Sequence, residues 1–481
     1  VISLYTGRVV LEALGIEDYG IYNVIGGLIA IFSFINNSMA QASQRFIAYE
    51  LGAGHMRLQS VFSTGLYIHF MLALVIVILG ETVGLWYVYN VAVIPADRFT
   101  AALWIYQFSI LIAATTVITV PYNALIIAHE RMSAFAWLSM LEVALKLVIA
   151  WVILICPFDR LVFYGMMMTV VAVLMRVAYG LYAARNFPES QFKIRPDRGC
   201  IREMGSFAGW SILGSLAAVG YTQGLNLLLN AFFNPAVNAA RGVAVTVQSV
   251  LRNFSGNFQM AVNPQITKLF ASGEAEGLRQ LVYRASRFTG SLYLLIAVPV
   301  YIEIDTLLSL WLVEVPQYTA TFIRLLLLVS MVEVLASPLN TSVQATGRIR
   351  SFEITTGVIM LLVVPLGYVV LKFTHRPELA FVVFLLQTLV AMCARLMFAH
   401  RKIGISIPRY FSHVLLRLVG VVVVGASVPL WVNMNMDQSV WRFICVTLSA
   451  VVMTGIGVFT LGFQQSERTA VVARIKNIVR F

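Results

Sequence analysis

One pattern occurs twice in this chain, as VPYNALIIAHERMSAF at residues 120–135 and as SPLNTSVQATGRIRSF at residues 337–352. Both stretches place Pro, Asn, Ala, Arg and Phe at the same spacing. The matching residues are Pro121, Asn123, Ala128, Arg131 and Phe135 in the first stretch and Pro338, Asn340, Ala345, Arg348 and Phe352 in the second. Such a match between distant segments indicates an internal repeat.

A second pair of segments supports the repeat. Residues 36–61, which begin NNSMAQASQRF, align without gaps with residues 257–282, which begin NFQMAVNPQIT. The identical residues are Asn36, Met39, Ala40, Gln44, Gly52, Gln59 and Val61 in the first and Asn257, Met260, Ala261, Gln265, Gly273, Gln280 and Val282 in the second. The two pairs of segments together support an internal repeat.

The composition is that of an integral membrane protein. Hydrophobic residues make up 59% of the 481 residues and charged residues only 12%, whereas soluble domains carry about 25% charged residues. The formal net charge is +12. In membrane proteins such an excess of Lys and Arg usually collects in cytoplasmic loops. We expect no nucleic-acid partner, because the chain lacks the polar surface of a soluble basic domain.

Apolar stretches long enough to cross a bilayer follow one another along the chain. They lie near residues 19–45, 60–80, 100–127, 133–155, 161–184, 204–231, 236–262, 281–302, 318–345, 350–372, 378–399, 411–432 and 440–463. The opening VISLYTGRVVLEALG is apolar but too short to span, so we expect it to be the end of an incomplete first helix. The sequence predicts an all-α integral membrane protein with about fourteen transmembrane helices, because barrel strands are shorter.

The loops set the expected orientation. One alternating set carries most of the Lys and Arg residues, whereas the other carries Arg98, Arg160 and Arg376. The first set is expected to be cytoplasmic, with both termini on that side. The longest loops are expected near 81–98 and 185–203.

Each repeat holds six predicted helices, so both halves enter the membrane from the same side. We expect two parallel-related six-helix bundles facing a central cleft, an arrangement suited to alternating access. The expected organisation is an N-terminal bundle at 1–184, a cytoplasmic linker at 185–203, a C-terminal bundle at 204–400, two appended helices at 411–463 and a basic tail at 464–481.

Pro121 and Pro338 fall at equivalent places, late in their helices. A proline inside a helix removes one hydrogen bond and bends the helix. The bend can serve packing of the bundle, or it can act as a hinge during opening. Both interpretations stay open.

Charged residues inside predicted spans are costly and usually face a cavity or a partner. Glu142, Lys146 and Glu333 are candidate ion-coupling groups, although Glu142 and Lys146, one turn apart, can equally form a simple ion pair. Deep arginines favour a cationic, water-filled cavity that binds an anion. Another group lies near helix ends, where we expect long side chains to reach the headgroups: Arg176, Arg284, Arg287, Lys372, Arg395 and Arg417.

No catalytic arrangement is recognisable. The sequence contains no phosphate-binding loop of the Walker type and no nucleophile beside a candidate base in a known motif. The cysteines and histidines show no metal-ligand spacing. We therefore expect no enzyme activity, no catalytic residues, no metal site and no cofactor.

GRVVLEALGIEDYGIYNVIGGL at residues 7–28 and NNSMAQASQRFIAYELG at residues 36–52 resemble bacterial polysaccharide transporters. These belong to the multidrug/oligosaccharidyl-lipid/polysaccharide exporter superfamily, and the chain looks like the lipopolysaccharide or O-antigen flippase branch found in Bacteroidetes-like genomes. The resemblance covers essentially the whole chain.

The resemblance implies transfer of an undecaprenyl-pyrophosphate-linked oligosaccharide, a lipopolysaccharide or capsule precursor, across the bacterial inner membrane. It implies a cationic substrate cavity, which carries over to Arg8, Arg45, Arg252 and Arg324. It also implies antiport of H+ or Na+, with membrane lipids and polysaccharide assembly proteins as further partners.

Two other functions compete with this one. A multidrug antiporter of the same superfamily would need acidic groups for organic cations, and Glu142 and Glu333 are the deep ones here. A membrane polymerase or ligase would need a large outer loop with catalytic residues, which the predicted loops do not provide.

Overall fold

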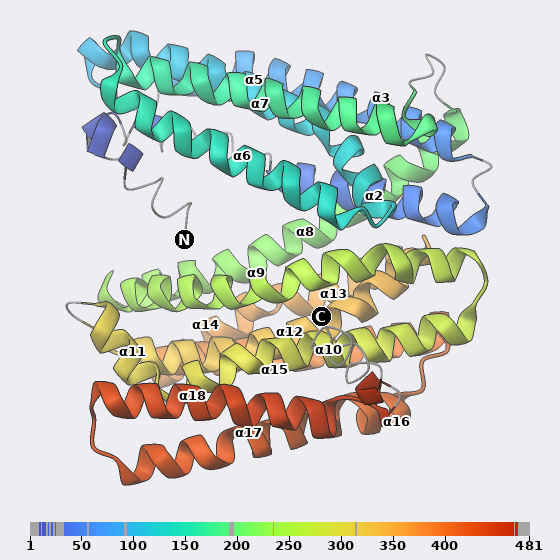
Figure 1. Ribbon diagram of the computed structural model, residues 1–481. Helices are drawn as coiled ribbons and strands as arrows, with labels where there is room; N and C mark the ends of the chain where they lie inside the picture. Colours follow the sequence, from blue (N-terminus) through green and yellow to red (C-terminus); the bar gives the residue numbers. More distant parts are fainter. Residues whose placement is uncertain are drawn as a thin grey trace, which may run out of the picture. The chain divides into compact units, whose positions relative to one another are not determined.

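The computed structural model describes residues 33–54, 57–90, 94–191, 197–233, 235–312, 315–465 and 467–469, with short pieces of the first 32 residues: 9–10, 12–15, 18, 21–22 and 25. Every regular element in these residues is helical, as predicted (Figure 1). The chain divides into two compact units, Val1–Ile212 and Leu213–Phe481, here called unit 1 and unit 2. The boundary lies inside one long helix, α8 (Arg198–Phe232).

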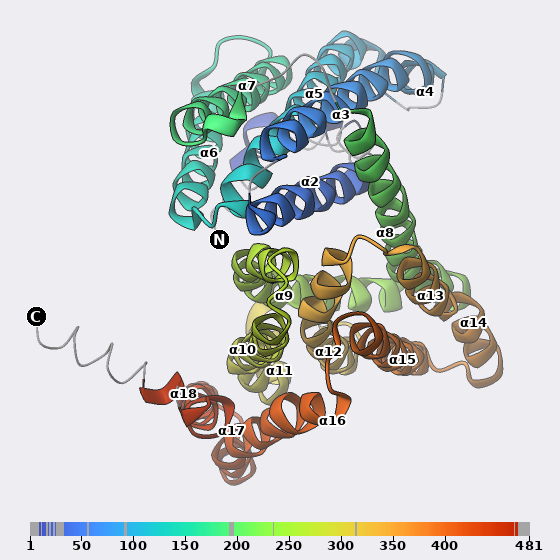
Figure 2. The same ribbon diagram turned by 90° about the vertical axis from the view of Figure 1, so that its right-hand side faces the viewer.

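Unit 1 is built around α5. Its longer helices, before α8, are α2 (Ser33–Ala53), α3 (Leu58–Leu79), α4 (Leu85–Asn90), α5 (Phe99–Ala128), α6 (Met132–Val152) and α7 (Arg160–Asn186). Helix α5 packs against α2, α3 and α7, and α6 covers α7 (Figure 2). The side chains of Ile105, Tyr106 and Leu125 on α5 are almost completely buried in these contacts.

Unit 2 is built around α12. Its helices after α8 are α9 (Pro235–Ala271), α10 (Ala275–Ile302), α11 (Ile304–Trp311), α12 (Thr319–Ala345), α13 (Arg350–Leu361), α14 (Val363–Thr374), α15 (Pro377–Ile403), α16 (Ile407–Tyr410), α17 (Leu416–Asn435) and α18 (Val440–Gly457). Helix α12 packs against α9, α10 and α15, while α13 and α14 cover α15. The packing around α12 in unit 2 thus repeats the packing around α5 in unit 1, as the internal repeat predicts.

The exterior of the helices shows that this is a multi-pass membrane protein. Within the described residues, 10 helical segments are long and apolar enough to cross a membrane. They turn large apolar side chains outward, for example Trp137, Trp431 and Trp441, which are 70%, 67% and 73% exposed. So much exposed apolar surface is stable only against lipid. Helices α8 and α9 are longer, with 35 and 37 residues, but they carry more polar residues.

The loop expected near 81–98 is mostly helix. Helix α3 continues through a wide turn at Gly80–Gly84 into α4, which ends at Asn90. Tyr106 donates a hydrogen bond to the Gly80 carbonyl (2.6 Å), and its ring fills the space where a side chain at Gly84 would lie. The sequence predicts the end of a span near residue 80, and the structure continues the helix beyond it. In the structure, the glycines let α5 approach closely.

The two appended helices, α17 and α18, pack against α10 and are tied to it at both ends. Beyond α18, Glu467 accepts hydrogen bonds from Arg287 at 2.7 Å and pairs with Arg284 at 2.8 Å. At the other end of α10, Glu303 pairs with Arg442 at 3.2 Å.

Arg287 is 1% exposed. Its predicted snorkelling to the headgroups is therefore wrong, because a buried carboxylate is its partner. Most of the predicted tail, residues 470–481, lies outside the described residues.

Candidate functional site

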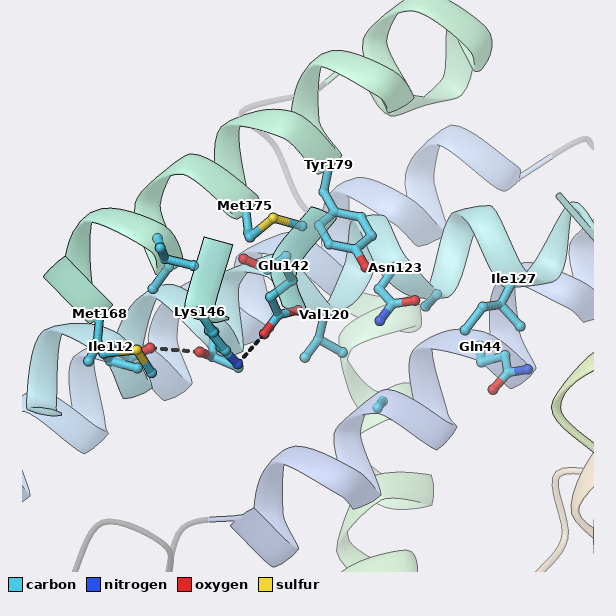
Figure 3. A pocket seen from close by; sticks show the side chains of 16 residues that line it. Gln44, Ile112, Val120, Asn123, Ile127, Glu142, Lys146, Met168, Met175 and Tyr179 are labelled. Carbon is cyan, nitrogen blue, oxygen red and sulfur yellow. Dashed lines mark hydrogen bonds and ion pairs between the residues drawn. The ribbon is translucent and has the colours of Figure 1, made fainter. Parts of the chain in front are cut away.

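Unit 1 contains a cavity of about 330 Å³ between α2, α5, α6 and α7 (Figure 3). One wall is apolar and includes Ile112, Met168 and Met175. The polar lining residues are Gln44, Thr116, Thr119, Asn123, Glu142, Lys146 and Tyr179. We call this cavity the unit 1 pocket.

Glu142 and Lys146 form an ion pair in this pocket. Lys146 Nζ lies 2.6 Å from Glu142 Oε1, one turn away on α6, and Figure 3 shows the pair at the cavity wall. The two side chains are 38% and 40% exposed, so both can meet water or an ion that enters the pocket. The pairing lowers the cost of placing two charges in a membrane-spanning helix. Their role in ion coupling stays a prediction.

Two amide side chains in the unit 1 pocket each have one polar atom without a hydrogen-bond partner among the described residues. The Asn123 Oδ1 and Gln44 Nε2 atoms are buried, and neither has a hydrogen-bond partner in the part of the chain that the structure describes. Both residues belong to the repeated segments. An unsatisfied buried acceptor and donor cost free energy unless a ligand or water completes them. The pocket is therefore suited to a polar guest.

Pro121 and Pro338 lie inside continuous helices, α5 and α12. Because proline has no N–H, Pro338 leaves the carbonyl of Val334 without its helical partner. Gln259 on α9 donates its Nε2 hydrogen to that carbonyl at 3.2 Å. Helix α9 thus supplies the hydrogen bond that Pro338 cannot make. The hinge interpretation stays a prediction.

Unit 2 contains a cavity of about 410 Å³ between α8, α9, α12 and α15. Its charged lining residues are Arg241 and Arg252, accompanied by Thr222, Gln223, Gln248, Ser249 and Asn253. The described lining includes no carboxylate. Leu225, Leu326, Phe381 and Phe384 supply an apolar side. We call this cavity the unit 2 pocket.

The two arginines of the unit 2 pocket are held differently. Arg241 Nη2 donates to the Thr222 carbonyl at 2.8 Å, which fixes its guanidinium against α8. Arg252 Nη1 lies 3.0 Å from Glu333 Oε2 on α12. The Arg252 side chain is 48% exposed and Glu333 only 16%. Arg252 therefore presents part of its guanidinium to the cavity while a more buried carboxylate balances its charge.

Two other predicted cavity arginines, Arg45 and Arg324, are not among the described residues that line the unit 2 pocket. Arg324 Nη2 lies 2.6 Å from Asp305 Oδ2 on α11. Arg45, in unit 1, lies over the rings of Phe46 and Phe207 at 4.4 and 5.4 Å from their centroids. Arg8 lies outside the described residues. Of the three predicted arginines that the structure describes, Arg252 lines one of the two pockets.

Sequence reasoning missed the interior position of Arg395. It was expected to reach the headgroups, but its side chain is only 7% exposed, within electrostatic range of Glu333, Tyr221 and Glu353. Glu353 is itself 8% exposed. These residues come from four different helices, and their sequence positions do not show that they lie together. The position of Glu333 inside a predicted span was the one sequence signal for this cluster.

Solved structures of membrane transporters share this fold. An outward-facing multidrug resistance MATE family transporter of the MOP superfamily is 14% identical, with 84% of this chain and 91% of that chain covered and a TM-score of 0.71. The Vibrio cholerae MATE transporter VcmN is 17% identical over 83% of this chain and 92% of that chain, with a TM-score of 0.72. No protein-family model matches the sequence, nor does any curated protein sequence.

A third structure of this fold comes from Pyrococcus furiosus. This MOP superfamily transporter has a binding pocket of reversed polarity that suggests a different function. It is 14% identical over 84% of this chain and 91% of that chain, with a TM-score of 0.69. The chain therefore has the MATE-type fold of MOP superfamily transporters, as the resemblance in its sequence implied. The fold likeness does not single out the polysaccharide branch.

Proposed function

We propose that this protein is a secondary transporter that moves an organic substrate across the membrane by alternating access in exchange for an ion. The MATE-type fold supports this proposal, as does a polar pocket inside the helices of each unit. Charged residues inside membrane helices are costly and often mark a path for a substrate or an ion. Under this proposal the chain performs no covalent chemistry.

We propose an anionic, hydroxyl-rich substrate, and the unit 2 pocket is the observation that carries this choice. Arg241 and Arg252 line it together with amides and hydroxyls, and no described lining residue is acidic. Guanidinium groups match phosphate geometry, and amides and hydroxyls match sugars. The apolar side around Phe381 and Phe384 suits an adjoining lipid chain. A polyprenyl-pyrophosphate-linked oligosaccharide combines all three features.

The second candidate is a multidrug antiporter for organic cations, and the comparisons favour it over the first. Two of the similar structures described above are MATE family transporters, one of them a multidrug resistance protein. The unit 1 pocket offers Glu142 with apolar and aromatic neighbours, a lining that suits an organic cation. Lys146 at 2.6 Å neutralises that carboxylate, which is why we place this candidate second.

For either substrate we propose H+ or Na+ as the coupling ion and Glu142 as the group that exchanges it. Glu333 is the weaker choice because its side chain is only 16% exposed, whereas that of Glu142 is 38% exposed and lines the unit 1 pocket. We further propose that the protein lies in the bacterial inner membrane with both termini in the cytoplasm.

Transport by the full-length protein in proteoliposomes tests the proposal. A labelled undecaprenyl-pyrophosphate oligosaccharide and a fluorescent organic cation are followed separately under an imposed proton or sodium gradient. Gradient-dependent movement of the lipid-linked sugar establishes the first candidate and names the ion. Movement of the dye alone replaces it with the second candidate. If neither the lipid-linked sugar nor the dye moves in vesicles that hold the gradient, the transporter proposal is refuted.

A further inference from the structure

Glu333 interacts with two arginines that differ in their access to the unit 2 pocket. Its Oε2 atom lies 3.0 Å from Nη1 of Arg252, whose side chain is 48% exposed. Glu333 also lies within electrostatic range of Arg395. Arg395 is only 7% exposed and is not among the residues that line the pocket. The Glu333 carboxylate is thus paired with a pocket arginine and lies in the neighbourhood of an interior arginine.

The interior arginine is incompletely satisfied. Arg395 Nε is buried without a hydrogen-bond partner in the residues that the structure describes. Its other acidic neighbour, Glu353, packs so closely on α8 that a side chain at Gly214 would overlap its carboxylate. Glu353 also accepts a hydrogen bond from Gln344. Glu353 is therefore held in place, whereas Arg395 retains a donor that Glu333 can use.

We propose that Glu333 passes from Arg252 to Arg395 when an anion of the phosphate or pyrophosphate class binds in the unit 2 pocket. The anion takes over the exposed face of Arg252 and repels the carboxylate beside it. A buried carboxylate is costly without a cation, and Arg395 provides one inside the same unit. This inference rests on the anionic substrate proposed above. It adds a mechanism by which binding of that substrate moves an ion pair within unit 2.

The exchange links pocket occupancy to helix contacts. In the described structure, the Glu333 carboxylate ties α12 to α9 through Arg252. After the exchange the same carboxylate ties α12 to α15 through Arg395. Moving one ion pair between helices is a two-state change that a ligand can bias. Such a change is what an alternating-access transporter needs in order to move only when its pocket is filled.

The test is a double-mutant cycle on ligand affinity. Farnesyl pyrophosphate, a short prenyl pyrophosphate, is titrated calorimetrically into the purified full-length protein in detergent. In Glu333→Gln, Arg252 no longer has to release a carboxylate, so the affinity rises roughly tenfold. In Arg395→Gln, Glu333 has no second partner and holds Arg252 more firmly, so the affinity falls roughly tenfold.

The double variant separates the exchange from a general charge effect. Without the Glu333 carboxylate, Arg395 has no group to accept in the exchange. The affinity of the double variant for farnesyl pyrophosphate should therefore lie within about twofold of that of Glu333→Gln. Arg376→Gln removes an exposed arginine just before α15 and is the matched control, with unchanged affinity. The inference is overturned if Arg395→Gln binds farnesyl pyrophosphate with the wild-type affinity. It is also overturned if Arg395→Gln lowers the affinity by the same factor in the Glu333→Gln background as in the wild type.

Three further outcomes are decisive. If Arg395→Gln does not fold, Glu333→Gln alone carries the test, and an unchanged affinity of that variant refutes the exchange. If the wild type binds neither farnesyl pyrophosphate nor inorganic pyrophosphate but binds an organic cation, the anionic substrate itself is wrong. Pyrophosphate binding without coupling between positions 333 and 395 removes the exchange alone and leaves the proposed substrate standing.

Discussion

At the scale of single residues, Gln259 shows how the helix interior accommodates a repeated proline. Its Nε2 donates to the Val334 carbonyl, the group that Pro338 leaves without a helical partner. We expect Gln259→Leu to destabilise the protein by about 1–3 kcal/mol, because a buried acceptor loses its donor. Thermal unfolding in detergent measures the effect.

The control for this prediction is Pro338→Ala, which restores an N–H to the Val334 carbonyl. In that background, Gln259→Leu should cost clearly less than in the wild type. Equal costs in both backgrounds would show that Gln259 stabilises the protein by other contacts. A loss of transport in Pro338→Ala without a loss of stability would favour the hinge interpretation of the proline.

Glu142 carries the residue-scale prediction for ion coupling. We expect Glu142→Gln to lower gradient-driven transport at least about tenfold, equivalent to ~1.4 kcal/mol, because the amide cannot exchange an ion. Substrate exchange without a gradient should persist, since that mode needs no net ion movement. Lys146→Met is the paired control: it removes the same ion pair but keeps the carboxylate. Unimpaired gradient-driven transport by Glu142→Gln would exclude Glu142 as the coupling group.

At the scale of elements, buried ion pairs attach the appended helices. Glu303 is 1% exposed, pairs with Arg442 and accepts a hydrogen bond from Asn433 at 2.9 Å. We expect Arg442→Met to destabilise the protein by about 3–5 kcal/mol, because it leaves a buried carboxylate without its cation. The unfolding midpoint in detergent measures this. The double variant with Glu303→Gln should recover part of the loss, and the exposed Arg376→Met should have little effect.

The start of α8 has an acid-sensitive cap. Asp197 Oδ1 accepts hydrogen bonds from the backbone N–H of Gly199 and Cys200, at 2.8 and 3.4 Å. These bonds, followed by one from Arg57, lower the pKa of Asp197 below its ordinary value of 3.8. Its stabilising contribution is therefore complete above that ordinary value and is lost as the pH falls through the lower, folded-state pKa.

Asp197→Asn tests the cap, because the amide keeps an acceptor oxygen but cannot titrate. We expect its unfolding midpoint to fall less than that of the wild type between about pH 5 and pH 3. The comparison is made in the same detergent, at one protein concentration. Parallel curves for the two proteins would show that the carboxylate of Asp197 makes no acid-dependent contribution.

At the scale of the whole molecule, the sequence predicted the helices because their signal is local. A run of apolar residues identifies a span by itself, and the repeated Pro and Asn positions identify α5 and α12 as equivalent. The buried arginines could not be predicted in the same way. Arg287 and Arg395 stand near the ends of apolar runs, where a reader of sequence expects headgroups. Their acidic neighbours, Glu467 and Glu333, lie far away along the chain and become visible only through packing.

Orientation is the remaining whole-molecule prediction, and α10 provides its geometry. With 28 residues at about 1.5 Å each, α10 is long enough to cross the membrane. Glu274 directly precedes α10, and Glu303 directly follows it. Asp437 lies in the connection between α17 and α18. Asn433 and Arg442, one on each side of Asp437, both bond to Glu303. Glu274 and Asp437 therefore lie on opposite sides of the membrane. Both residues are exposed.

Single cysteines at these two positions, in a chain whose four own cysteines are replaced by serine, are treated in intact cells with a membrane-impermeant maleimide. The excess of Lys and Arg in the loops on the Glu274 side predicts that this side is cytoplasmic. Asp437→Cys should therefore be labelled in intact cells and Glu274→Cys only after the cells are opened. The reverse pattern would place the Glu274 side outside the cell and would contradict the proposed orientation with both termini in the cytoplasm.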